Sequence, residues 1–218
     1  DFAAGVKAHE AGLLEDAEGL YRRVVESDPA PQELKASAWV NLGVLAEAKG
    51  DYGAADTYYS SALLAASSPE TQAKALMNLG VVRDKTGRSD EAENHYREAL
   101  KIPVSPRSRA TLLEALGNLE RRRGRIREAR KAFEDALKAS GGEGVAVQED
   151  ARARMLANLG ILLEQEGDLE RAGQRYEEAV SARAGAETIA IAWINLGLLK
   201  ARTGEFTGAR VAHEEALK

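Results

Sequence analysis

The stretch AWVNLGVLAEAKGDYGAADTYYSSA, residues 38–62, carries a pattern of small and large residues that returns throughout the chain. Gly43 is followed by Gly50, and then by Ala55, Tyr59 and Ala62. Gly50 falls where two helical patterns meet, and a residue without Cβ can adopt the left-handed conformation that ends a helix. The stretch therefore predicts a helix, a tight turn and a second helix.

The same register occurs six times. The first glycines are Gly5, Gly43, Gly80, Gly117, Gly160 and Gly197, and the turn glycines are Gly12, Gly50, Gly87, Gly124, Gly167 and Gly204. Each turn is followed by Ala17, Ala55, Ala92, Ala129, Ala172 or Ala209, and then by Tyr21, Tyr59, Tyr96, Phe133, Tyr176 or His213. One such unit cannot bury its own apolar face, so the copies are expected to stack.

This register resembles the tetratricopeptide repeat family over nearly the whole chain. The resemblance implies an all-α fold, a right-handed α-solenoid of six helical hairpins in which small residues mark the close approaches between helices. We expect a single array over residues 1–218, with repeats at about 1–29, 30–67, 68–104, 105–141, 145–183 and 185–218.

The repeats are longer than the usual tetratricopeptide unit. The first glycines lie 37 or 38 residues apart, and 43 apart between the fourth and fifth copies, whereas the usual period is about 34. Ser68-Pro69 and Ser105-Pro106 are signals for a helix start, since a hydroxyl caps and proline suits the first helical position. We therefore expect first helices about one turn longer than usual. The glycine-rich segment 140–144 is interpreted as a linker and hinge, because it lacks the lysine and hydroxyl of a nucleotide-binding loop.

Composition limits the class of protein. The 218 residues are 44% hydrophobic and 30% charged, with a net charge of −5 and no cysteine. Disulfides and thiolate metal sites are therefore excluded, and nucleic acid is not an expected partner, because nonspecific binding needs a basic surface. No apolar run reaches the length of a membrane span, so no membrane insertion is expected. The compartment is open, with cytoplasmic as the default. Since the chain starts at Asp1 without a methionine and stops at Lys218, at the end of a second helical pattern, we expect further sequence beyond both ends.

No constellation for catalysis is visible. The three histidines, His9, His95 and His213, fall in different repeats, and none accompanies a candidate nucleophile or a second metal ligand. His213 is interpreted as a substitute for the core aromatic. The sequence therefore predicts a protein that is not an enzyme and uses no cofactor or metal.

A row of asparagines is the main candidate for a binding site. The residue two before the first glycine is Asn41, Asn78, Asn158 or Asn195, with Ala3 and Ala115 interrupting the row. An amide offers both a donor and an acceptor, which suits the main chain of an extended peptide. The row resembles the asparagine ladders of O-linked N-acetylglucosamine transferases and kinesin light chains, which implies that it faces the concave groove. The alternative is that these amides bond to neighbouring helices and stabilise the superhelix.

Basic residues fall at or near the same face. Those expected to contact a ligand are Lys74, Arg121, Arg122 and Arg154. Their charge favours an acidic partner segment.

We therefore predict a scaffold for protein–protein interaction that binds an extended, acidic peptide in its groove. Two alternatives stay open. The repeats could present substrates to a larger enzyme such as a glycosyltransferase, or they could form an architectural module that self-associates. The second alternative rests on the final repeat, where we expect Val211, Ala212 and Leu217 to lack a covering helix.

Overall fold

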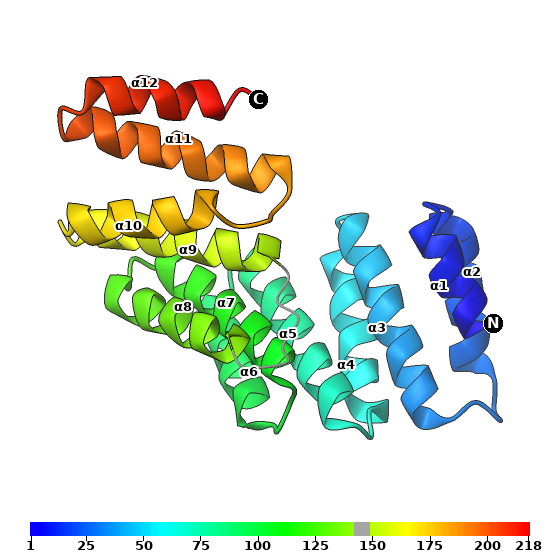
Figure 1. Cartoon of the computed structure of the whole chain (residues 1–218). Coiled ribbons are helices and arrows are strands. Elements are labelled where there is room, and N and C mark those ends of the chain that lie inside the picture. Colours follow the sequence, from blue (N-terminus) through cyan, green and yellow to red (C-terminus); the bar gives the residue numbers. More distant parts are fainter. Residues whose placement is uncertain (142–148) are drawn as a thin grey trace. The chain divides into compact units, whose positions relative to one another are not determined.

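The computed structural model describes residues 1–141 and 149–218, which contain twelve α-helices and no strand. Part of the predicted hinge, 142–144, and the predicted start of the fifth repeat at 145 lie outside the described residues. The chain divides into two units, residues 1–108 and 109–218, which are described separately. Each unit consists of helical hairpins, which confirms the predicted all-α solenoid of stacked hairpins (Figure 1).

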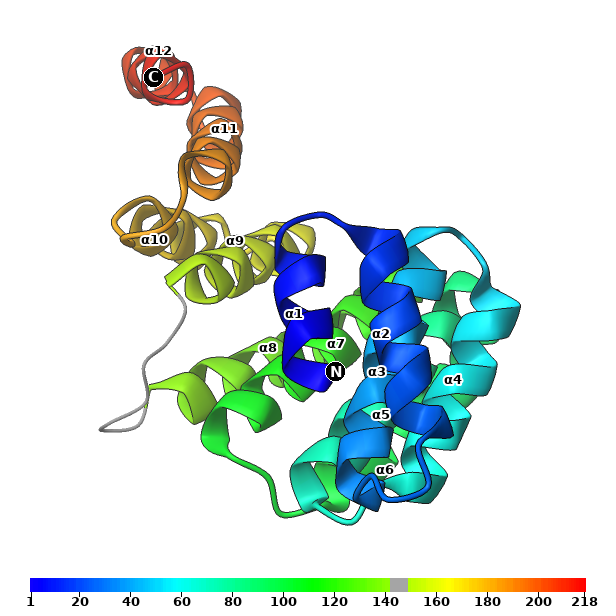
Figure 2. The ribbon, with the colours of Figure 1, turned by 90° about the vertical axis from the view of Figure 1, so that its right-hand side faces the viewer.

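The first unit holds three hairpins. They are α1 (Phe2–Glu10) with α2 (Leu14–Glu26), α3 (Gln32–Ala48) with α4 (Tyr52–Ala65), and α5 (Pro69–Lys85) with α6 (Ser89–Lys101). Odd-numbered helices are called first helices, and even-numbered ones second helices. The two views of the ribbon show the partners of each hairpin lying side by side (Figures 1 and 2).

The second unit repeats this arrangement. It comprises α7 (Pro106–Arg122), whose first three residues belong to the first unit, α8 (Ile126–Ser140), α9 (Glu149–Gln165), α10 (Leu169–Val180), α11 (Ala186–Arg202) and α12 (Phe206–Glu215). From α3 to α11 every first helix is 17 residues long, whereas the second helices have 10 to 15 residues. From the second hairpin onward, the first helix is therefore the longer partner.

Close contact between a glycine and an aromatic ring holds each hairpin together. A Cβ on Gly43 would lie 2.4 Å from Cε1 of the Tyr59 ring, and the same geometry recurs in the other repeats. The four tyrosines at this position, and Phe133 in the fourth repeat, are among the most deeply buried large side chains. The ring thus fills space that any larger residue at the first glycine would occupy.

The turn between the two helices of a hairpin depends on the second glycine. Gly50 has φ of 78°, and the corresponding glycine of each other hairpin is also left-handed. No other described residue has positive φ. The sequence prediction of the turns is thus confirmed, because L-residues with Cβ rarely adopt this conformation.

An acidic residue in the first turn of one first helix secures the connection to the next repeat. Glu33 accepts hydrogen bonds from the backbone and hydroxyl of Ser67 and Ser68 and from the Thr71 hydroxyl. Ser68 in turn caps α5 by accepting from the Thr71 N–H. Burial acts to raise the pKa of Glu33, but these hydrogen bonds outweigh it and lower the pKa to about 2.

Related clamps occur in two later connections. Glu70 accepts from the Ser105 N–H and the Ser108 hydroxyl, at 2.5 and 2.6 Å. Asp150 accepts from the N–H of Gly185, which precedes α11, at 2.7 Å. Ser105 caps α7, since its hydroxyl accepts from the Ser108 N–H. Three connections between repeats are therefore fastened by a carboxylate of the preceding repeat.

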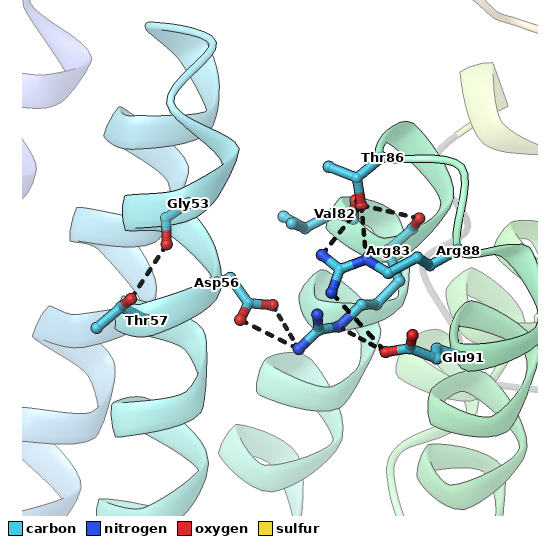
Figure 3. Close-up of polar contacts among 8 residues, drawn as sticks. All are labelled: Gly53, Asp56, Thr57, Val82, Arg83, Thr86, Arg88 and Glu91. Atoms are coloured by element: carbon cyan, nitrogen blue, oxygen red, sulfur yellow. Dashed lines mark hydrogen bonds and ion pairs between the residues drawn. The ribbon is translucent and has the colours of Figure 1, made fainter.

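A partly buried ion pair joins the second helices of the second and third repeats. Figure 3 shows Arg83, at the end of α5, between Asp56 of α4 and Glu91 of α6. Its guanidinium lies 2.8 Å from Asp56 Oδ1 and 3.4 Å from Glu91 Oε2. One arginine thus links three helices of two repeats.

The last hairpin differs in part from the expectation for it. Val211 and Leu217 are exposed, at 45% and 88%, as expected. The expectation for Ala212 was wrong, because this residue is only 2% exposed. It belongs to the buried side of the hairpin. His213 lies against Gly197, where the other repeats have a ring, but it is exposed.

Candidate peptide-binding face

The asparagine row lies on the first helices α3, α5, α9 and α11, and all four side chains are half-buried. The leucine after each of them is buried, at 1 to 3% exposure. Among the described residues, Asn78, Asn158 and Asn195 have no side-chain hydrogen bond, in contrast to the many polar contacts at the connections. Asn41 lies beside the Tyr21 hydroxyl. Burial raises the pKa of Tyr21, and the Asn41 side chain acts to lower it.

The first unit contains a pocket of about 480 Å³ on its first helices. Two predicted site residues, Asn41 of α3 and Lys74 of α5, line it together with Glu10 of α1. The remaining lining residues are Phe2, Val6, His9, Tyr21, Ser37, Val40 and Thr71. The pocket thus combines an amide, one cation and one anion with apolar walls.

The second unit contains a pocket of about 510 Å³. Asn195 lines it with Ile161, Leu198 and Arg202, and the other lining residues are Glu164, Gln165 and Tyr176. Neither of these two pockets is lined by Asn78 or Asn158. The structure therefore places Asn41 and Lys74 together, and Asn195 in a separate site in the other unit.

The predicted basic residues differ in their surroundings. Lys74 is exposed, and no hydrogen bond or ion pair with another described residue engages it. Arg154 forms an ion pair with Glu114, and its Nε lies 3.4 Å from the Glu114 Oε1. Burial raises the pKa of Glu114, and the arginine acts to lower it. Arg121 is half-buried, and its Nε has no hydrogen-bond partner among the described residues. Arg122 is exposed, but its side chain takes part in a polar interaction within the chain. Of these four residues, Lys74 is therefore the one that is both exposed and without a polar partner among the described residues.

Polar chains between adjacent repeats were not foreseen from the sequence. In the first unit Tyr59 donates to Glu47 at 3.1 Å, and Lys85 of the next first helix lies 2.7 Å from the same carboxylate. In the second unit Tyr176 donates to Glu164 at 2.6 Å, and Arg202 lies 2.6 Å from it. Burial raises the pKa of both tyrosines, and the carboxylates add to this effect.

A signal for these chains exists in the register. The glutamates stand four residues after a first glycine, and the basic residues five after the next one. The charges of Lys85 and Arg202 are thus used within the fold. This explains why a count of basic residues overestimates the positive charge open to a ligand.

The described residues contain no cluster of three or more histidine or acidic side chains arranged to hold a metal ion. Within the same ranges no helix is both long and apolar enough to cross a bilayer.

Comparison with solved structures shows the fold. BtubC (BKLC) from P. vanneervenii is 23% identical with a TM-score of 0.81, over 94% of this chain and 87% of that one. PilF of Pseudomonas aeruginosa is 21% identical with a TM-score of 0.78, over 97% and 86% of the two chains. MamA is 21% identical with a TM-score of 0.62, over 81% and 92%.

Sequence comparison identifies the repeat itself. No curated protein matches the chain. Family models described as tetratricopeptide repeat match residues 34–103, 114–187 and 158–218. These ranges cover most of the chain, including five of the six hairpins. The chain belongs to the tetratricopeptide repeat family and is built as a scaffold for protein interaction.

Proposed function

We propose that this chain binds an extended peptide segment of a partner protein along the faces of its first helices. The observation that carries the proposal is the asparagine row: Asn78, Asn158 and Asn195 are half-buried and have no hydrogen-bond partner among the described residues. Asparagine has poor helix propensity, so its recurrence at one position of the first helices has a cost. Pairing with a peptide main chain would use both the donor and the acceptor of each amide.

Apolar neighbours support the same function. Val40 and Asn41 line one pocket, and Ile161, Leu198 and Asn195 line the other. Alternate side chains of an extended peptide point to opposite sides, so every second side chain could enter such a pocket while the backbone meets an amide. The proposed preference for an acidic segment is supported by Lys74, because of the four predicted basic residues it is the one that is exposed and unpaired.

The experiment begins with peptides selected against the full chain from a random library. Their affinity is measured for Asn78→Ala/Asn158→Ala and for Asn41→Ala/Asn195→Ala, with Asn94→Ala on the exposed face of α6 as the matched control. We expect each double variant to weaken binding about tenfold at an unchanged or higher melting temperature, since alanine favours the helix, and Asn94→Ala to leave affinity unchanged. Unchanged affinity with a lowered melting temperature would show instead that the amides serve the superhelix.

A second candidate function is self-association through the last hairpin. Ile194 is 43% exposed, whereas Val40 at the same register position is 1% exposed under the next repeat. Leu217 is 88% exposed, whereas its counterpart Leu63 packs into a core cluster. The first hairpin does not offer an equally apolar surface, because Lys7 stands two residues after its first glycine, where the other repeats have Leu45 or another apolar residue. Two copies would therefore pair last hairpin to last hairpin, about a twofold axis.

Light scattering over a range of concentrations tests this candidate. We expect the natural chain to double in mass as concentration rises, and Ile194→Glu/Leu217→Glu to stay monomeric. A natural chain that is monomeric throughout, or a dimer that survives both substitutions, would remove this function.

A further inference from the structure

The Tyr21 hydroxyl distinguishes the first pocket from equivalent positions in other repeats. Tyr21 is fully buried, and its hydroxyl lies beside Asn41 without forming a hydrogen bond of good geometry to any described residue. In the second and fifth repeats the corresponding tyrosines donate to Glu47 and Glu164. The first repeat has His9 at that register position, so the acceptor is missing. A buried hydroxyl without a well-formed hydrogen bond is costly. The hydroxyl is closed to solvent, so a ligand atom in the pocket that Tyr21 lines could satisfy it only when the Asn41 side chain turns toward the ligand.

Opposite charges from two helices line this pocket. Glu10 ends α1 and Lys74 lies in the second turn of α5, while Asn41 lies on α3 between them in the order of first helices. All three line the pocket with Tyr21, and neither charged side chain has an ion-pair partner among the described residues. The pocket is therefore polarised from α1 to α5.

We propose that this pocket binds a short extended peptide whose basic side chain faces Glu10 and whose acidic side chain faces Lys74, with a main-chain carbonyl accepting from the Tyr21 hydroxyl. The Asn41 amide pairs with the peptide backbone next to that carbonyl. The proposal rests on the proposed function and specifies what its first site selects: an oppositely charged pair of residues in one order, rather than acidic character alone.

The spacing of the two charges follows from the fold. Two steps between neighbouring helices amount to ~18 Å, and the charged side chains both reach inward to the pocket. An extended chain advances about 3.3 Å per residue. The basic and acidic residues of the ligand are therefore expected about four residues apart, with an apolar residue between them against Phe2, Val6 and Val40.

The test uses three blocked pentapeptides in an NMR titration of the full-length, isotope-labelled chain. They are acetyl-Lys-Ala-Leu-Ala-Asp-amide, the same composition with the charged residues exchanged, and the neutral analogue with Gln and Asn. We expect shifts at the Asn41 amide, and about fivefold or tighter binding of one charged order over both other peptides. In Glu10→Lys/Lys74→Glu the preference should pass to the other order. Equal binding of the two orders, or an unchanged preference in the double variant, overturns the proposal.

Tyr21→Phe and Tyr59→Phe form a matched pair that separates binding from folding. Loss of the Tyr21 hydroxyl should weaken the preferred peptide several-fold and leave the melting temperature equal or higher, because no hydrogen bond of good geometry is lost. Loss of the Tyr59 hydroxyl, which donates to Glu47, should lower the melting temperature and leave affinity unchanged. Full affinity in Tyr21→Phe overturns this site.

Failure of this site and failure of the proposed function give different results. If library-selected peptides bind and depend on the asparagine row while the pentapeptides shift nothing in the first pocket, only the site is wrong. If no peptide from either source shifts any first helix, the proposed function falls with it.

Discussion

Glu33 of α3 accepts a hydrogen bond of 2.7 Å from the hydroxyl of Ser68, the residue that caps α5. The same carboxylate holds the Ser67 and Ser68 N–H groups. A side chain of one repeat therefore fixes where the first helix of the next repeat begins, and the stability of the first unit should depend on its charge.

Glu33→Gln is expected to lower the free energy of unfolding by about 1–2 kcal/mol at neutral pH, since an amide cannot accept the same set of bonds. Urea unfolding measures this. The control is Glu187→Gln at the same register position of α11, which has no such contacts among the described residues and shares the helix-dipole effect. We expect the control to change stability by less than about 0.5 kcal/mol, and equal losses in both variants would contradict the clamp.

The contribution of Glu33 should also depend on pH. Its pKa is lowered in the folded chain from 4.5 to about 2, so the folded state holds the ionised form more strongly than the unfolded state does. The stabilisation is therefore complete above the unfolded pKa and is lost as pH falls from 4.5 through about 2. The stability difference between the natural chain and Glu33→Gln should shrink over this range. A difference that stays constant would show that the carboxylate charge is not involved.

Gly43→Ala is expected to destabilise the chain by about 1–3 kcal/mol, because the new methyl would meet the Tyr59 ring at 2.4 Å. Gly19→Ala is the control, since nothing lies within 4 Å of a Cβ at that helical position. It should stabilise by about 0.5–1 kcal/mol through helix propensity. Thermal unfolding of the two variants gives shifts of opposite sign, and a stabilised Gly43→Ala would disprove the packing role of the glycine.

Tyr176→Phe and Glu164→Gln are expected to be coupled. The Tyr176 hydroxyl and the Arg202 guanidinium both contact the Glu164 carboxylate, so each single change should cost about 1 kcal/mol. A double-mutant cycle in urea should give a coupling energy of about 1 kcal/mol between the two positions. Additive effects would mean that the hydroxyl and carboxylate do not stabilise each other.

Arg83→Gln is expected to cost about 1–2 kcal/mol, because it leaves Asp56 without its partner at a site where the arginine side chain is 16% exposed. Arg97→Gln removes an ion pair with Glu93, one helical turn away, in which the arginine side chain is 56% exposed, and it should cost no more than about 0.5 kcal/mol. Chemical unfolding of both variants makes the comparison. Equal costs would place the Arg83 contact among ordinary surface pairs.

The sequence by itself determined the hairpins, because the residues that make them are local and recur in register. A glycine at each turn, a ring opposite each first glycine and a serine-proline pair before α5 and α7 have effects within a few residues or one hairpin. It also located the asparagine row on the first helices.

Only the tertiary structure decided which charges are free. Lys85, Arg154 and Arg202 look the same in sequence as Lys74, yet each is paired with a glutamate 38 or 40 residues away. Ion pairing depends on distances of a few ångströms between different repeats, and these follow from how the helices stack rather than from the helical pattern. The Tyr21 hydroxyl was missed for a related reason: the register places His9 where Glu47 and Glu164 stand, but only the structure shows that those glutamates bond to the tyrosines of their hairpins.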